Sequence, residues 1–262
     1  NDRTFYVGAP SGGLWKSTDA GVNWIPLSDQ LPQIGVSGIA IDPKNSNIIY
    51  IATGDDDARD TYSVGVLKST DGGASWNKTG LDFSTNNRIS NEIYIHPEDS
   101  NILWVSTNIG FYKSTDAGAT WVNTRSVNIM DFKLKPGDPN TIYAVSSSLF
   151  YKSTDGGDSF DVISSGLPAD SSLRQVLDVT EANPEVVYVL SVNSDQSFKG
   201  LYKSTDSGAN FVKTGQEDNF FDGVQTWFNL ALTVSPVDEN MVFIGEIAVW
   251  RSSDAGDTFE RK

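Results

Sequence analysis

The nonapeptide KSTDAGVNW, residues 16–24, decides the fold, because it returns five more times along the chain. The copies are KSTDGGASW at Lys68, KSTDAGATW at Lys113, KSTDGGDSF at Lys152, KSTDSGANF at Lys203 and RSSDAGDTF at Arg251. We call this motif the box. Its aspartates are Asp19, Asp71, Asp116, Asp155, Asp206 and Asp254, and subtracting successive numbers gives spacings of 52, 45, 39, 51 and 48 residues. Self-similarity at such a period is typical of a repeat architecture.

Each position of the box has a role in making a turn. Asp and Ser side chains readily hydrogen-bond the backbone amides of a turn. The glycine two residues after each aspartate permits a positive φ, and the Trp or Phe three residues later can pack back onto its own repeat. Because one active site needs no six copies, the six aspartates are predicted to be structural.

A second signature lies between the boxes and completes the repeat. IDPKNSNIIYIATG at Ile41 joins an extended run, a Pro/Asp/Asn turn and a β-branched, aromatic run, and related segments start at Ile95, Leu134, Val179 and Val234. The unit is therefore four antiparallel strands, A to D, with the box as the C–D turn. Repeated four-stranded units of this length predict an all-β fold, a β-propeller with six or seven blades.

The first repeat begins at Thr4-Phe5-Tyr6-Val7, which aligns with strand B. The first blade is thus expected to lack its innermost strand. We expect residues 1–262 to form a single propeller domain, cut from a longer secreted protein whose other domains are partners of this one.

Composition excludes several classes of function. The 19 basic and 34 acidic residues give a net charge of −15, which disfavours nucleic acid as a partner. Cysteine is absent and His96 is the single histidine, so Cys/His and Ser/His catalysis have little support. No apolar run is long enough to cross a membrane, so membrane insertion is not expected.

The box resembles the Asp-box, also called the BNR repeat, and six near-ideal copies cover almost the whole chain. Asp-box propellers include sialidases, the xyloglucanases of glycoside hydrolase family 74, sortilin-like receptors and a photosystem assembly factor. The PSGGLWKSTD opening also resembles secreted, surface-displayed proteins of Bacteroidota that use type IX secretion. The resemblance implies the fold and an extracellular or cell-surface location, but it does not choose a function.

Subtracting the repeat leaves the connection GQEDNFFDGVQTWFN, residues 215–229, as the main candidate site. Trp227 is the only tryptophan without a role in the repeat, and the connection leads into an innermost strand near the predicted channel mouth. Aromatic faces beside carboxylates suit sugar rings. The predicted ligand-binding residues here are Phe220, Phe221, Phe228, Asp218 and Asp222 besides Trp227. The alternative is a loop that folds its own aromatics over the propeller.

A second departure is GDDDARDTYSVG, residues 54–65. Asp55, Asp57 and Asp60, with Asp56 beside them, are oxygen ligands of the kind that Ca²⁺ prefers, although their spacing does not fit an EF-hand. The alternative is a solvated acidic loop. Tyr62 is predicted to extend the aromatic platform for the ligand.

Glycoside hydrolysis is the one chemistry to weigh, because it requires only two carboxylates and a cleft. The Arg-Ile-Pro motif of sialidases is absent. The catalytic segment of the family 74 enzymes, Tyr-x-x-x-Asp-x-Gly-Gly, matches residues 6–13, but Pro10 stands where that family has its aspartate. We therefore expect a module that binds a protein, peptide or glycan; the alternative is a glycoside hydrolase that uses Asp222 and Glu217.

Overall fold

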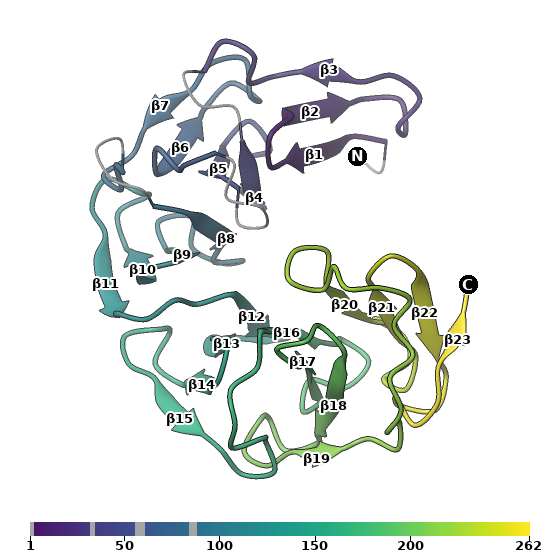
Figure 1. Cartoon of the computed structure of the whole chain (residues 1–262). Helices are drawn as coiled ribbons and strands as arrows, with labels where there is room; N and C mark the ends of the chain where they lie inside the picture. The colour runs from purple at the N-terminus through teal and green to yellow at the C-terminus, as the bar shows by residue number, and fades with distance from the viewer. Residues whose placement is uncertain (1–2, 32–34, 56–60, 84–87) are drawn as a thin grey trace. The chain divides into compact units, whose positions relative to one another are not determined.

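The computed structural model describes residues 3–31, 35–55, 61–83 and 88–262. Every regular element in these residues is a β-strand. Within the same residues, no helix is long and apolar enough to cross a membrane. The chain divides into two compact units, residues 1–128 and 129–262, each of which is described by itself (Figure 1).

Unit 1 holds three antiparallel sheets, whose strands pair in chain order. The first sheet has only three strands, as expected from its start at strand B. The strands are β1 (Phe5–Ala9), β2 (Gly13–Ser17) and β3 (Ile25–Pro26); β4 (Val36–Ile41), β5 (Ile49–Thr53), β6 (Val66–Ser69) and β7 (Asn77–Lys78); and β8 (Ser90–Ile95), β9 (Leu103–Thr107), β10 (Gly110–Ser114) and β11 (Val122–Arg125).

Unit 2 holds three sheets of four strands, again paired in chain order. The strands are β12 (Asp131–Lys135), β13 (Asp138–Val145), β14 (Phe150–Ser153) and β15 (Asp161–Ile163); β16 (Arg174–Val179), β17 (Val187–Val192), β18 (Phe198–Ser204) and β19 (Val212–Lys213); and β20 (Ala231–Val234), β21 (Val242–Gly245), β22 (Val249–Ser252) and β23 (Glu260–Arg261).

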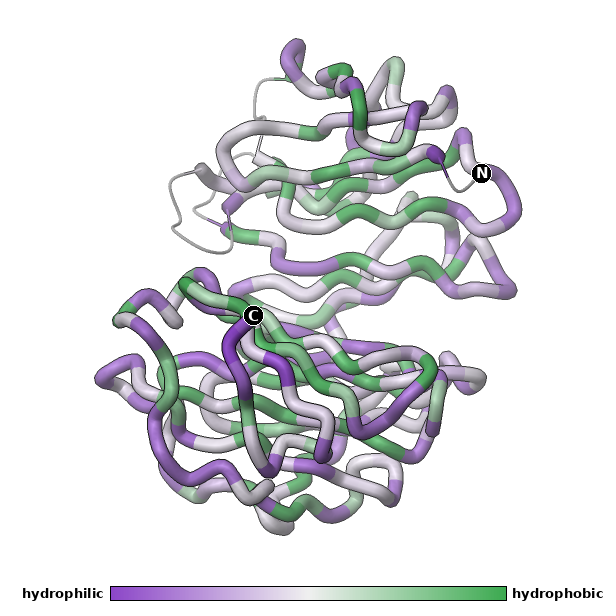
Figure 2. The backbone as a smooth tube through the Cα atoms, turned by 90° about the vertical axis from the view of Figure 1, so that its right-hand side faces the viewer, coloured by the Kyte–Doolittle hydropathy of each residue, from purple (hydrophilic) through white to green (hydrophobic). Residues whose placement is uncertain are grey.

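The core of each unit lies between its three sheets, and it covers both faces of the middle sheet. On β5, Ile49 and Ile51 pack with Leu14 of the first sheet, whereas Tyr50 packs with Val105 of the third. Because successive side chains of a strand point to opposite faces, all five residues of β5 are buried. Figure 2 shows the result as apolar strands joined by polar turns within each unit. Stacked four-stranded sheets of this kind are the blades of a β-propeller, which confirms the predicted fold class.

Candidate functional site

The box forms the same hydrogen-bonded turn in every blade. In the third blade, the buried hydroxyl of Ser114 accepts the Gly118 N–H (2.9 Å) and donates to Asp116 (2.9 Å). The Asp116 carboxylate also accepts the backbone N–H of Thr120 (2.8 Å) and its hydroxyl (2.6 Å). The bond from the Thr120 hydroxyl is the main reason that the pKa of Asp116 is lowered. The carboxylate is thus fully engaged in its own turn, which supports the structural interpretation of the boxes.

A second bond joins each box to the segment just before strand B of the same blade, which is the A–B turn in the second to sixth blades. The residue after the box aspartate donates its N–H to a carbonyl of that segment, and all six bonds are 2.8–2.9 Å long. The donors and acceptors are Ala20 and Arg3, Gly72 and Asn47, Ala117 and Asn101, Gly156 and Asn140, Ser207 and Glu185, and Ala255 and Asn240. We call this bond the pin. It holds the box and that segment together at one end of each blade.

Blades are also bonded to one another at this end. Tyr50 of the second blade donates its hydroxyl to the Ala117 carbonyl of the third blade (3.0 Å), and Lys68 donates to the same oxygen (3.3 Å). The Lys68 ammonium lies 5.1 Å from the centre of the Tyr50 ring. In unit 2, Tyr188 occupies the place of Tyr50 in its blade but donates to the Glu239 carbonyl in the A–B turn of the sixth blade (2.9 Å). Each bond runs from one blade to the following one.

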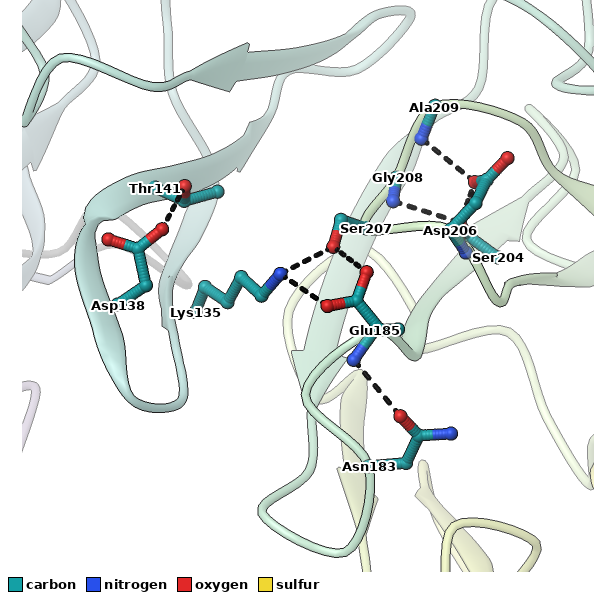
Figure 3. Close-up of polar contacts among 10 residues, drawn as sticks. All are labelled: Lys135, Asp138, Thr141, Asn183, Glu185, Ser204, Asp206, Ser207, Gly208 and Ala209. Atoms are coloured by element: carbon teal, nitrogen blue, oxygen red, sulfur yellow. Dashed lines mark hydrogen bonds and ion pairs between the residues drawn. The ribbon is translucent and has the colours of Figure 1, made fainter.

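The fifth blade departs from the repeat at the pin, where Glu185 and Ser207 replace the usual Asn and Ala or Gly (Figure 3). Lys135 of the fourth blade donates to Glu185 Oε1 (2.7 Å) and to Ser207 Oγ (2.6 Å). Ser207 donates in turn to Glu185 Oε2 (2.5 Å). These three side chains were not predicted as a site, although the exchange of Asn for Glu185 within the repeat marks their place.

A serine next to a lysine raises the question of nucleophilic catalysis, and the surrounding bonds argue against it. A base must be free of its proton, but Glu185 holds the Lys135 ammonium as an ion pair. The same bond lowers the pKa of Glu185, which makes its carboxylate a weak base. The nearby N–H groups of Gly208 and Ala209 already donate to Ser204 and Asp206, so they do not offer an oxyanion hole. The trio is best described as a polar link between two blades.

The other candidate surface is the connection of residues 215–229 in unit 2. Trp227 is 44% exposed, and its ring meets that of Phe228 edge-on at 4.6 Å. Arg174 Nη1 donates to the carbonyls of both residues (3.0 and 3.2 Å). The fully buried Thr226 donates its hydroxyl to the Gln196 carbonyl of the fifth blade (2.9 Å). Three hydrogen bonds to the fifth blade therefore hold an exposed tryptophan in a fixed turn.

Phe220 and Phe221 belong to the same connection, but their rings pack into the core. Phe221 is only 8% exposed, and Phe220 stacks on Phe259 at 4.9 Å and meets Trp250 at 5.1 Å. Both belong to the cluster between the fifth and sixth blades. The predicted aromatic platform is therefore divided: Trp227 and Phe228 remain near the surface, while the other two rings pack inward.

The acids of the connection are exposed and mostly paired. Glu217 binds Lys213 (2.6 Å), and Asp222 binds Arg261 (2.9 Å). Asp218 is exposed. Carboxylates bound to surface cations lack the burial that prepares a general acid for catalysis.

The candidate residues of unit 1 gather into no metal site among the described residues, where no group of three potential ligands occurs. Asp55 is buried at 1% exposure, and Asp56, Asp57 and Asp60 lie outside the described residues. Tyr62 is 49% exposed. The calcium site and the role of Tyr62 stay predictions.

One acid that sequence analysis missed stands out by its environment. Asp178 on β16 accepts the Val234 N–H of β20 (2.7 Å). Burial raises the pKa of Asp178, with the charge of Asp131 adding to the effect. Asp131 itself accepts the Leu177 N–H (2.8 Å) and binds Lys133 (2.6 Å). Both acids join the innermost strands of adjacent blades, where an unpaired strand edge needs acceptors.

Comparison with known proteins adds a family context. No family model matches the chain. Xyloglucanase Xgh74A of Acetivibrio thermocellus is 33% identical over 116 residues, which are 40% of this chain and 14% of that protein. A xyloglucanase of Paenibacillus sp is 28% identical over 116 residues, 40% of this chain and 11% of its own length. The chain thus spans about one seventh of the length of the first curated relative.

Solved structures share the whole fold. The GH74 enzyme of Niastella koreensis aligns with 100% of this chain and 44% of its own, at a TM-score of 0.75 and 22% identity. YCF48 bound to D1 peptide aligns with 100% of this chain and 77% of its own, at a TM-score of 0.65 and 17% identity. These likenesses show a β-propeller fold.

Proposed function

We propose that this chain, a GH74-like β-propeller, is a carbohydrate-binding module of an extracellular protein, and that Trp227 and Phe228 form part of its ligand-binding surface. The observation that carries the proposal is an exposed indole on a turn fixed by Arg174 and Thr226. An aromatic face that is already in place can stack on the C–H groups of a sugar with little loss of conformational freedom. The xyloglucanase relatives favour a glycan over a peptide.

Binding is favoured over hydrolysis by the residues at the positions where acids are needed. Pro10 occupies the place of the family's catalytic aspartate, and its carbonyl accepts a bond from Thr61 (2.9 Å). Proline has no side-chain proton to transfer. Glu217 and Asp222, the alternative acids, are held by surface cations. We therefore expect the chain alone to release no reducing ends from xyloglucan.

Binding of soluble xyloglucan by isothermal titration calorimetry tests the proposal. Replacing Trp227 by Ala is expected to weaken binding by about fivefold or more, the effect of losing roughly 1 kcal/mol of aromatic contact. The melting temperature is expected to change little, because the indole is 44% exposed. Trp24→Ala is the matched control, since Trp24 is exposed to a similar extent, 37%, but belongs to a box.

The two variants separate a ligand platform from a general effect of losing an exposed tryptophan. Equal affinity for xyloglucan in the parent protein and Trp227→Ala, with both fully folded, would remove this surface from consideration. Hydrolysis of xyloglucan that disappears in Asp222→Asn or Glu217→Gln would instead establish the enzymatic alternative.

A further inference from the structure

A hollow in unit 1 lies between the end of the first blade and the box of the second. Its volume is about 420 Å³, within the range of small-ligand sites. Leu27, Leu31 and Trp76 supply apolar surface to it, and Asp29, Gln30 and Ser75 supply polar groups. The apolar three are partly buried against the core between the two blades.

The wall of this hollow exists because backbone pairing at the outer edge of the first blade ends earlier than in the second blade. In the second blade, the Val66 N–H donates to the Leu81 carbonyl, so backbone pairing continues past the outermost strand. In the first blade, the corresponding Leu14 N–H donates to the buried hydroxyl of Ser28 (2.8 Å). A side chain thus replaces a strand carbonyl, and residues 28–31 form a turn closed by the Leu31 N–H and the Ser28 carbonyl (2.9 Å).

The turn places its polar side chains outward. Asp29 and Gln30 are exposed, whereas Ser28 before them is buried and Leu31 after them is partly buried. Among the residues that the structure describes, neither the Asp29 carboxylate nor the Gln30 amide group has a hydrogen-bond or ion-pair partner. Ser75 donates its hydroxyl to Asp71 (2.5 Å), so its oxygen can still accept a bond. The edge of the hollow therefore presents several free acceptors and one amide donor.

Trp76 is bonded differently from the other two tryptophans of the boxes. The indoles of Trp24 and Trp121 donate to a glycine carbonyl of their own box, Gly21 and Gly118 (3.0 and 3.1 Å). Trp76 donates across to Leu27 of the first blade (3.1 Å). The bond fixes the indole against the wall of the hollow. The related hollow beside the third box, of about 500 Å³, has Lys68, Lys78 and Asp116 in its lining and no aromatic residue.

We propose that the hollow formed by Trp76, Leu27, Asp29, Gln30 and Ser75 is a second carbohydrate-binding site, which takes one or two residues of a neutral sugar chain. An apolar wall with a fixed indole offers a surface for the C–H face of a pyranose ring. The free acceptors of Asp29 and Ser75 match the hydroxyl donors of a sugar, and the amide of Gln30 can both donate and accept.

A neutral ligand fits the charges better than an acidic or a basic one. The net charge of −15 and the exposed Asp29 disfavour uronic acids and phosphates. A basic peptide is repelled by the Lys16 ammonium. This group donates to the Gly72 carbonyl (3.4 Å), next to the lining residue Gly73. This site is independent of the one at Trp227, so that either can fail while the other stands.

Binding of cellohexaose to the Trp227→Ala protein tests the proposal without the first site. The double variant Asp29→Ala/Gln30→Ala in that background is expected to weaken binding about tenfold, the usual effect of losing a hydrogen bond to a charged group. Both side chains are exposed, so the melting temperature is expected to stay the same. Asn77→Ala/Lys78→Ala, which changes two exposed residues at the related hollow, is expected to leave the affinity unchanged.

Hydrogen exchange read by mass spectrometry locates the ligand directly. Cellohexaose is expected to protect the amides of residues 27–31 and 73–76. The proposal is overturned if the Trp227→Ala protein does not bind cellohexaose, if the Asp29/Gln30 variant binds it as well as its background does, or if protection is confined to residues 215–229. Displacement of cellohexaose by tetralysine would overturn it in favour of a basic peptide.

Discussion

At the scale of single residues, the serine of the box contributes more to the stability of the fold than the aspartate that marks the box in the sequence. Ser114 is 1% exposed, and its hydroxyl is the acceptor for the buried Gly118 N–H. The aspartate beside it lies at the surface. An amide that loses its acceptor inside the protein cannot turn to water, whereas a surface carboxylate can.

Ser114→Ala is therefore expected to lower the free energy of unfolding by about 1–3 kcal/mol, the cost of leaving a buried amide unpaired. Chemical denaturation at neutral pH measures it. Ser126→Ala, at an exposed serine of the same blade, is the control and is expected to stay within about 0.5 kcal/mol of the parent protein. A similar loss in both variants would mean that the box hydroxyl has no special role.

The aspartates of the boxes predict a loss of stability in acid. Hydrogen bonds from the Ser75 side chain and backbone, and from Ser69, lower the pKa of Asp71 from 3.8 to about 2. A lowered pKa in the folded state contributes stability above the unfolded value, and this stability is lost as the pH falls from about 4 to about 2. The pKa values of Asp19, Asp155 and Asp206 are also about 2.

Asp71→Asn is expected to flatten the fall in melting temperature between pH 4 and pH 2, because the amide cannot take up the proton. Thermal melts across this range measure the slope. Asp29→Asn is the control, because this carboxylate has no hydrogen-bond partner within the described part of the chain, and it is expected to leave the slope as it is. Identical slopes in the parent and the Asp71 variant would show that the box carboxylate does not contribute to acid unfolding.

At the scale of elements, the pKa of Asp178 on the innermost strand β16 is shifted in the opposite direction from those of the box aspartates. Because burial raises the pKa of Asp178, its stabilising contribution is complete below the unfolded pKa and is lost as the pH rises through the folded value. An asparagine keeps an oxygen for the Val234 N–H and removes the partly buried charge. Asp178→Asn is thus expected to raise the melting temperature at pH 7 and to have less effect at pH 3.

Urea denaturation of the Asp178 variant at the two pH values checks this sign. Asp178→Ala serves as the comparison, because it removes the charge and the acceptor together and is expected to destabilise the protein at both. A variant Asp178→Asn that is less stable than the parent at pH 7 would show that the carboxylate is bound favourably as an anion.

The sequence predicts strands and turns well but connections poorly, and the connection of residues 215–229 shows why. A strand has a period of two and the box recurs six times, so their residues can be assigned by position. The four aromatic residues of the connection follow no period, and nothing in their order says that Phe220 and Phe221 turn into the core while Trp227 stays outside. Ser28 and Trp76 were hidden for a related reason, since their roles depend on a neighbouring blade.

At the scale of the whole molecule, the charge of −15 predicts a stability that rises with salt. Like charges on a compact surface repel each other, and ions screen this repulsion. Raising sodium chloride from about 0.01 M to about 0.3 M is expected to increase the melting temperature, because the screening length falls from roughly 30 Å to less than 10 Å. Choline chloride is expected to act in the same way.

Calcium chloride at matched ionic strength separates screening from a bound ion. A further rise in melting temperature with calcium, abolished in Asp55→Asn, would support the predicted site around Asp55, Asp57 and Asp60. Equal curves for the two salts would assign the whole effect to screening. A melting temperature that falls in sodium chloride would contradict the argument from net charge.

The pins described above have a consequence for ancestry. Each pin lies inside one blade, and the bonds of Tyr50 and Tyr188 run from a blade to its successor. Each of these tyrosine bonds therefore joins a side chain of one repeat to a backbone carbonyl of the next. A stretch of gene encoding one blade can therefore be copied or deleted with these repeated bonds intact, except at the fourth and fifth blades, where Lys135 is matched to Glu185 and Ser207. Unequal crossing-over between repeats can therefore produce propellers with different numbers of blades. The recurring box is the part of the sequence in which such duplication can be recognised.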